Sequence, residues 1–234
     1  AAAWLRPADS TSVKIIESHT SDALLQLQIR GVAEDPNIPD DDQAVEKKEQ
    51  RPDSALGLIA DHLFKILRSK GNHLVFGGSR RNTEELSDRL RQMCEAANVP
   101  NEFFPHHGNL SREMRESLET RLRDGLLPTT AVATTTLELG IDIGSVESIA
   151  QIGAPSSISS LRQRLGRSGR REGKPAIVRI YAVESVIDRR SSVFDRLRVE
   201  TVQAVAAVRL LLNRWVESSS PGTAQHLSTL LHQT

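Results

Sequence analysis

Cysteine, aromatic residues and long apolar runs are all scarce in this sequence of 234 residues. The single cysteine, Cys94, excludes a disulfide within the chain and a zinc site built on cysteines. No uninterrupted apolar window of about 18 residues occurs, so we expect no membrane-spanning segment. The first ten residues, AAAWLRPADS, lack the basic and apolar regions of a secretory signal. We therefore expect a soluble, cytoplasmic chain.

Two further absences concern nucleotide and nucleic-acid chemistry. The sequence has no phosphate-binding loop of the pattern glycine, four residues, glycine, lysine and a hydroxyl residue. It also has no apolar strand that ends in an acidic run, and we expect no primary site for Mg²⁺ and a triphosphate in this chain. The aromatic residues are five Phe, two Trp and one Tyr, too few for a platform on which nucleic-acid bases stack.

The formal net charge is zero, but the charges are unevenly placed. Residues 34–53 hold eight acidic and three basic side chains, with few apolar residues, and this composition predicts a flexible acidic loop. Residues 162–214 hold thirteen basic and five acidic side chains. A basic half can attract a polyanion even when the whole chain is neutral. Two solvated faces would give the same counts, and charge alone does not decide between these interpretations.

Apolar spacing from Ser54 onward predicts strands that alternate with helices. The expected helices are 54–71, 82–98 and 111–125, and the expected strands are 73–78, 101–108, 129–134, 146–153 and 174–183. Two strands, 13–18 and 23–32, precede them. Alternation of this kind is typical of an α/β fold with a doubly wound, mostly parallel sheet.

Ligands of such a sheet bind at the loops beyond the carboxyl ends of the strands. In chain order, the loops here read GGSRRN, HHGNLSRE, TTTLELGIDIG and GAPSSISS. Each contains hydroxyls, glycines or arginines, which are groups that bind phosphate oxygens. His106 and His107 have no acidic or cysteine partners at metal-ligand spacing, so we expect a polar pair at a strand end and no metal site.

Residues 159–175, SSLRQRLGRSGRREGKP, combine five arginines and a lysine with three glycines. Fixed positive charges beside flexible backbone suit the binding of a phosphate group. Together with ATTTLELGIDIG, the segment QRLGRSGRREG resembles motifs V and VI of superfamily 2 helicases. The amino-acid sequence of these two segments is most similar to that of Lhr-like ATP-dependent helicases. VFGGSRRNTEEL resembles motif IV, and HHGNLSREMRE resembles the turn and helix that follow it.

The resemblance covers about residues 55–183 and implies a domain organisation. Residues 1–33 resemble strands that bridge from a preceding RecA-like domain, and 34–53 form the acidic loop. Residues 54–183 correspond to the second RecA-like domain, and 184–234 to a helical extension and the start of a winged-helix region. We expect the chain to be a fragment of a longer helicase.

The family binds ATP with Mg²⁺ between two RecA-like domains, and the first of these supplies most of the contacts. The resemblance therefore implies a preceding domain as partner, and it predicts that this chain alone does not hydrolyse ATP. The second domain supplies arginine fingers, which correspond here to Arg167 and Arg170. The implied nucleotide contacts are Gln163, Gly140, Asp142 and Gly166, with Asp142 accepting from the ribose hydroxyl. We expect Arg164 to tie the arginine segment to the partner domain.

The resemblance also implies contacts with a nucleic-acid strand, with DNA as the expected polymer and RNA or a hybrid left open. The residues that correspond to backbone phosphate contacts are Ser79, Arg80, Thr134, Thr135, His107, Gly108 and Arg112. Phosphate contacts carry no sequence information, so binding should be independent of sequence. The chain departs from the family at Gly78, where asparagine is common, and this leaves the local turn chemistry open.

Two other functions fit the sequence less well. A stand-alone nucleic-acid-binding module would share these loops and would lack any motor function. A dinucleotide-binding oxidoreductase would need a glycine fingerprint at the start of its first helix, and GGSRRN lacks the third glycine. The presence of a phosphate-binding loop upstream in the gene would decide between the motor and the stand-alone module.

Overall fold

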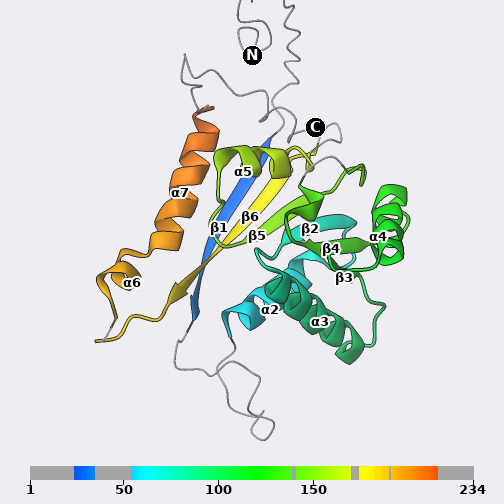
Figure 1. The fold of residues 1–234 in the computed structure, drawn as a ribbon, viewed down its shortest axis with the longest axis horizontal. Coiled ribbons are helices and arrows are strands. Elements are labelled where there is room, and N and C mark those ends of the chain that lie inside the picture. Colours follow the sequence, from blue (N-terminus) through cyan, green and yellow to red (C-terminus); the bar gives the residue numbers. More distant parts are fainter. Residues whose placement is uncertain (1–23, 35–53, 139–140, 170–173, 190, 216–234) are drawn as a thin grey trace, which may run out of the picture.

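The computed structural model describes residues 24–34, 54–138, 141–169, 174–189 and 191–215 (Figure 1). Within these ranges a six-stranded sheet has the order β1-β6-β5-β2-β4-β3, and every neighbouring pair of strands is parallel. The strands are β1 (Leu25–Glu34), β2 (Asn72–Phe76), β3 (Phe103–His106), β4 (Thr129–Ala133), β5 (Ser148–Ile152) and β6 (Ala176–Ser185). The helices are α2 (Ala55–Leu67), α3 (Arg80–Ala96), α4 (Arg112–Asp124), the 3₁₀ helix η3 (Thr135–Leu137), α5 (Ile158–Leu165), α6 (Val193–Leu197) and α7 (Val199–Leu212).

Helices cover both faces of the sheet. Apolar residues of α4, α5 and α7 pack on one face, for example Leu118, Leu161 and Ala204. The apolar residues of α2 and α3, among them Ile59 and Leu86, pack on the other face. The central strands β2 and β4 are buried along their whole length, as expected for parallel strands covered on two sides. The predicted α/β fold with a doubly wound parallel sheet is confirmed.

Serine residues fix where the helices begin. Ser54, Ser79, Ser111 and Ser157 each accept a hydrogen bond from a backbone N–H in the first turn of the helix that follows. Each such cap satisfies a donor that the helix itself cannot pair, and is worth about 1 kcal/mol. Helix α4 ends at Gly125, which adopts the left-handed conformation predicted for a helix end.

Strand β1 pairs with β6 over its whole length, from Leu25 beside Ala176 to Glu34 beside Ser185. The described part of residues 1–33 thus forms the edge of this sheet, and a bridging role for the segment stays a prediction. The acidic segment 34–53 lies outside the described residues except for Glu34, as does 216–234, where a winged-helix region was expected. No helix of the described residues is long and apolar enough to cross a lipid bilayer.

Candidate functional site

The loops that follow β2, β3 and β4 lie side by side at the carboxyl ends of these strands. The backbone N–H of Gly77 donates to the carbonyl of Ala133 (2.9 Å), and that of Thr134 donates to the carbonyl of His106 (3.2 Å). The sheet therefore gathers the expected strand contacts of three separate loops at one edge. These residues are Ser79, Arg80, His107, Gly108, Arg112, Thr134 and Thr135.

Ser79 and Arg80 are both exposed at the start of α3. The Oγ atom of Ser79 accepts from the backbone N–H of Asn82 (3.1 Å), which leaves its own hydroxyl hydrogen for an external acceptor. Arg80 lies in an open ion pair, with Nε 3.7 Å from Glu84 Oε1. The two residues can therefore donate to a phosphate group without breaking a buried contact.

Gly78, the departure from the resembled family, adopts a φ of +78°. This left-handed region is open to glycine, and among other residues asparagine enters it most readily. The turn before α3 thus has the backbone conformation that either residue allows. Glycine therefore adopts this turn without strain.

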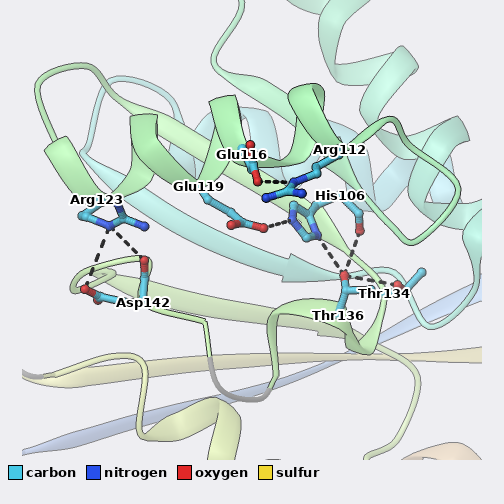
Figure 2. Close-up of polar contacts among 8 residues, drawn as sticks. All are labelled: His106, Arg112, Glu116, Glu119, Arg123, Thr134, Thr136 and Asp142. Carbon is cyan, nitrogen blue, oxygen red and sulfur yellow. Dashed lines mark hydrogen bonds and ion pairs between the residues drawn. The ribbon is translucent and has the colours of Figure 1, made fainter.

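The three expected strand contacts in the loop after β3 differ in exposure to solvent. A Cβ atom added to Gly108 would meet nothing within 4 Å, so the backbone is open to a ligand there. Arg112 is exposed and donates from Nε to Glu116 Oε1 (2.6 Å) on the next turn of α4 (Figure 2). His107 is instead buried, and its Nε2 lies 3.1 Å from Glu84 Oε1. Its imidazole faces α3 and is not on the surface.

The segment that follows β4 crosses the sheet from its carboxyl edge to its amino edge. It leaves β4 at Thr134, and twelve positions later the N–H of Val146 donates to the carbonyl of Arg167 (3.2 Å). The next N–H, of Glu147, donates to the carbonyl of Asn72 at the start of β2 (2.8 Å). We call residues 134–144 the crossing loop. Its two ends can therefore serve two different ligands.

The two ends of the crossing loop carry different groups. Thr134 is half-buried and Thr135 is exposed at the carboxyl edge. At the other end Asp142 is 79% exposed, and its Oδ1 accepts from the N–H of Gly144 (3.2 Å). Arg123 of α4 donates to the Asp142 carbonyl (3.2 Å), as Figure 2 shows. Gly140 lies outside the described residues. Asp142 thus presents a carboxylate to solvent, as a contact with a ribose hydroxyl requires.

Arg164 lies inside the domain, and the expectation that it ties the arginine segment to a partner domain is wrong. Its Nε and Nη2 both donate to Glu138 Oε2 (3.2 and 2.9 Å), and Nη1 donates to Gln151 Oε1 (2.6 Å). The guanidinium also stacks over the ring of Phe76, 4.3 Å from its centre. Only 9% of the Arg164 side chain and 11% of the Glu138 side chain is exposed. This buried pair joins α5 to the crossing loop.

Arg167 fastens the arginine segment to the same loop. Its Nη1 donates to the carbonyl of Ile141 (2.6 Å), and its Nη2 to the carbonyl of Glu138 (3.3 Å). Gln163 and Gly166 are exposed beside it. Arg170, the other expected finger, lies outside the described residues. The structure therefore brings Arg167, Gly166, Gln163 and the Asp142 end of the crossing loop into one connected unit.

Gly169 shows why this segment needs glycine. Its φ is +71°, and an added Cβ atom would lie 2.7 Å from the Cβ of Ala176 and 2.9 Å from its Cα. A larger residue would push against the start of β6 and strain the backbone. The close approach keeps the arginine segment beside the amino ends of β5 and β6, where Ser168 pairs with Val146.

His106 is the main residue of this edge that the sequence did not assign to the site. It is fully buried at the end of β3, with Nδ1 2.9 Å from Thr136 Oγ1 and Nε2 3.0 Å from Glu119 Oε1 (Figure 2). Burial lowers the pKa of His106, although the hydrogen bond to Glu119 opposes this shift. A polar pair at a strand end was expected, but its partners on α4 and η3 could not be derived from local sequence. Glu138 left a clearer signal, since it is a charged residue between two leucines.

Comparisons with known proteins show which proteins the chain resembles in sequence and in fold. Residues 58–172 match the family described as helicase conserved C-terminal domain. The chain is 32% identical over 133 residues to the ATP-dependent helicase Lhr-Core of Methanothermobacter thermautotrophicus, which is 57% of this chain and 15% of that protein. It is 39% identical over 98 residues to the Lhr-Core helicase of Saccharolobus solfataricus, which is 41% of this chain and 11% of that protein.

A solved structure has the same fold. The helicase Lhr of Mycobacterium smegmatis, bound to single-stranded DNA and AMP-PNP, superposes with a TM-score of 0.62 at 24% identity. The match covers 84% of this chain and 23% of that one. The chain thus spans a small part of the proteins that it matches.

Proposed function

We propose that the chain is the second motor domain of an ATP-dependent nucleic-acid helicase, and the match of residues 58–172 to the helicase conserved C-terminal domain family supports this proposal. In this proposal the carboxyl edge of the sheet holds a nucleic-acid strand, and the arginine segment meets ATP. The observation that carries the proposal is the crossing loop. Its threonines lie at one edge, its aspartate lies at the other, and two arginines of α5 and the segment after it fasten it between them.

Arg167 and Arg170 are assigned to the γ-phosphate of ATP. A guanidinium is always protonated and binds two oxygens at once, which suits the charge that spreads over a phosphoryl group during transfer. An arginine supplied in this way accelerates phosphoryl transfer by about 10³–10⁵-fold in related systems. Gln163, Gly166, Gly140 and Asp142 are assigned to the nucleotide beside them, with the Asp142 carboxylate accepting from a ribose hydroxyl.

The preceding RecA-like domain of the full-length protein is assigned most of the ATP contacts and the Mg²⁺ ion. When bound, Mg²⁺ neutralises charge on the triphosphate. This sequence has no phosphate-binding loop, and we expect this chain alone not to hydrolyse ATP. Its own residues orient the γ-phosphate end of the nucleotide and disperse the charge that develops there.

Ser79, Arg80, Thr134, Thr135, Gly108 and Arg112 are assigned to the phosphates of the strand. Exposed hydroxyls, an open glycine backbone and two surface arginines can bind phosphate oxygens at successive positions. His107 contributes through its backbone, because its ring is buried. We propose DNA as the polymer, a choice supported by the single-stranded DNA bound in the Lhr structure of M. smegmatis.

The salt dependence of binding tests this assignment on the chain itself. If about two to four phosphates are neutralised, the logarithm of the association constant for single-stranded DNA should fall with the logarithm of salt concentration with a slope of about −1.4 to −2.8. Binding should be weak and show little sequence preference. A fluorescence titration of labelled oligonucleotides that shows no salt dependence, or a strong sequence preference, would contradict the proposal.

A further inference from the structure

A chain of polar contacts runs from α4 through His106 to the threonines of the crossing loop. Glu119 Oε1 lies 3.0 Å from His106 Nε2, and His106 Nδ1 lies 2.9 Å from Thr136 Oγ1. Thr136 Oγ1 in turn lies 3.5 Å from Thr134 Oγ1. Figure 2 shows these four residues in sequence, from the helix to the edge where a strand is proposed to bind.

The Glu119 carboxylate determines which atom donates and which accepts in each of these hydrogen bonds. A carboxylate can only accept, so the His106 nitrogen beside Glu119, Nε2, carries a hydrogen. In neutral His106 the other nitrogen, Nδ1, is then an acceptor, and it takes the hydroxyl hydrogen of Thr136. The contact between the two threonines can use only the hydrogen of Thr134. Neutral His106 therefore favours a Thr134 hydroxyl that points back toward Thr136.

Protonation of His106 reverses these directions. Both ring nitrogens become donors, and Thr136 Oγ1 must accept from Nδ1. The Thr136 hydrogen is then released and can be donated to Thr134 Oγ1, or to the backbone carbonyl of His106, which lies 3.3 Å away. Donation to Thr134 leaves the Thr134 hydrogen for a phosphate oxygen. The positive charge on the imidazole favours a phosphate at the same place.

We propose that His106 is a positioning residue that sets the donor direction of Thr134, so that the crossing loop binds a nucleic-acid phosphate more tightly when His106 is protonated. The inference rests on the proposed function, because the phosphate contact of Thr134 does. It assigns a role to a side chain that does not itself touch the strand.

The groups around His106 determine the pH at which it is protonated. Glu119 on α4 favours the charged imidazole, whereas Arg115 on α4 and His107 on the neighbouring loop oppose it. Burial is the largest influence and lowers the pKa of His106 below the ordinary value of 6.5. The imidazole is therefore neutral at physiological pH. Affinity for nucleic acid should rise as the pH falls through this lowered pKa, and fall again as the pH rises.

Nitrogen-15 NMR of the histidine side chains tests the hydrogen-bond chain without nucleic acid. We expect neutral His106 to carry its hydrogen on Nε2 and to titrate below pH 6.5. A hydrogen on Nδ1 would reverse every direction in the chain and would overturn the inference. This measurement does not depend on whether the protein is a helicase.

Binding of a short fluorescein-labelled single-stranded DNA, at constant ionic strength from neutral pH to about pH 5, tests the functional step. One hydrogen bond gained corresponds to an affinity about three- to tenfold higher once His106 is protonated. In His106→Gln this step should disappear. Because His106 is buried, its replacement could disturb the fold. Glu119→Gln is therefore a second variant, and it keeps the imidazole. Without the carboxylate the charged imidazole is less favoured, so the step should move to lower pH.

His62→Gln is the matched control. It removes a different imidazole, which contacts Tyr181 on the opposite face of the sheet, and it should keep the step. A purely structural His106 would change affinity at every pH and would not let Glu119→Gln move the step. Wild-type chain that binds no DNA at any pH would contradict the proposed function and this inference together. DNA binding with the same pH dependence in His106→Gln would contradict the inference alone.

Discussion

The guanidinium of Arg164 connects three parts of the domain beside the candidate site. It reaches the crossing loop through Glu138, β5 through Gln151 and the ring of Phe76 on β2. A buried charge is tolerated only when it is paired and hydrogen-bonded, and all these contacts are needed to offset its desolvation. Arg164 therefore acts on both proposed ligand sites from inside the domain.

Loss of one partner of this pair should destabilise the fold. We expect Arg164→Ala to lower the free energy of unfolding by about 3–5 kcal/mol, because Glu138 is then buried without a partner. Arg91→Ala removes two exposed ion pairs on α3, with Asp88 and Glu95, and should change the urea midpoint little. Urea denaturation followed by circular dichroism measures both. An Arg164→Ala variant as stable as Arg91→Ala would show that the buried pair is not important for the fold.

The strands and helices were largely predictable, because local patterns determine them. Apolar spacing predicted β2, β4 and the helices α2, α3 and α4, although α3 begins at Arg80, two residues before its expected start. The predicted parallel strands 129–134 and 146–153 already imply the path of the crossing loop, because a connection between parallel strands runs from the carboxyl edge of the sheet to its amino edge. Local sequence did not indicate which side chains hold the loop in place.

Side-chain partners were the least predictable feature. Arg164 and Arg167 stand three positions apart in one arginine-rich segment, yet the first is buried and the second only half-buried. The partner of Arg164 lies 26 positions away, and no local pattern points to it. His106 is similar, since its burial depends on α4 packing over β3. The family resemblance identified the segments, but not which of their side chains face inward.

Strand β2 carries a histidine that should make the stability of the sheet depend on pH. Burial lowers the pKa of His73 to about 4, and its Nδ1 lies 2.8 Å from Ser148 Oγ on β5. Above pH 6.5, the pKa of this histidine in the unfolded chain, His73 is neutral in both states and does not reduce the free energy of unfolding. As the pH falls from 6.5 toward about 4, His73 binds a proton in the unfolded chain but stays neutral in the folded chain. Stability should fall by about 3 kcal/mol over this window.

Urea midpoints between neutral pH and about pH 4 measure this loss. The pKa values of His62 and His106 are lowered in the same direction, so some pH dependence remains without His73. His73→Gln should nevertheless have a clearly smaller slope than the wild type. Equal slopes would mean that His73 is not the group that titrates.

At the scale of the whole molecule, the chain places the groups proposed to bind the strand and the groups proposed to bind the nucleotide at two edges of one sheet. The crossing loop connects them, and Arg164 and Arg167 hold it in place. This arrangement suits a domain that must bind a strand and respond to a nucleotide at the same time. The chain spans 11% and 15% of the length of the two Lhr-Core helicases.

Replacement of the proposed fingers needs a structural control, because Arg167 also donates to two carbonyls of the crossing loop. Arg162→Ala is a matched variant, since Arg162 lies on α5 in the same segment and donates to the carbonyl of Trp215. Thermal unfolding of each variant separates a loss of fold from a loss of chemistry. Arg167→Lys and Arg170→Lys should rescue little, because one ammonium cannot span two phosphate oxygens.

Steady-state ATP turnover of the full-length protein at saturating nucleic acid, beside a binding titration on the same variants, tests the central claim most directly. We predict that Arg167→Ala and Arg170→Ala each lower turnover by about 10³-fold, equivalent to about 4 kcal/mol of transition-state stabilisation. Nucleic-acid affinity should stay within a few-fold of the wild type, and Arg162→Ala should turn over normally. If turnover survives in both finger variants while nucleic-acid binding collapses, the arginine segment is a clamp for the strand and the assignment is wrong.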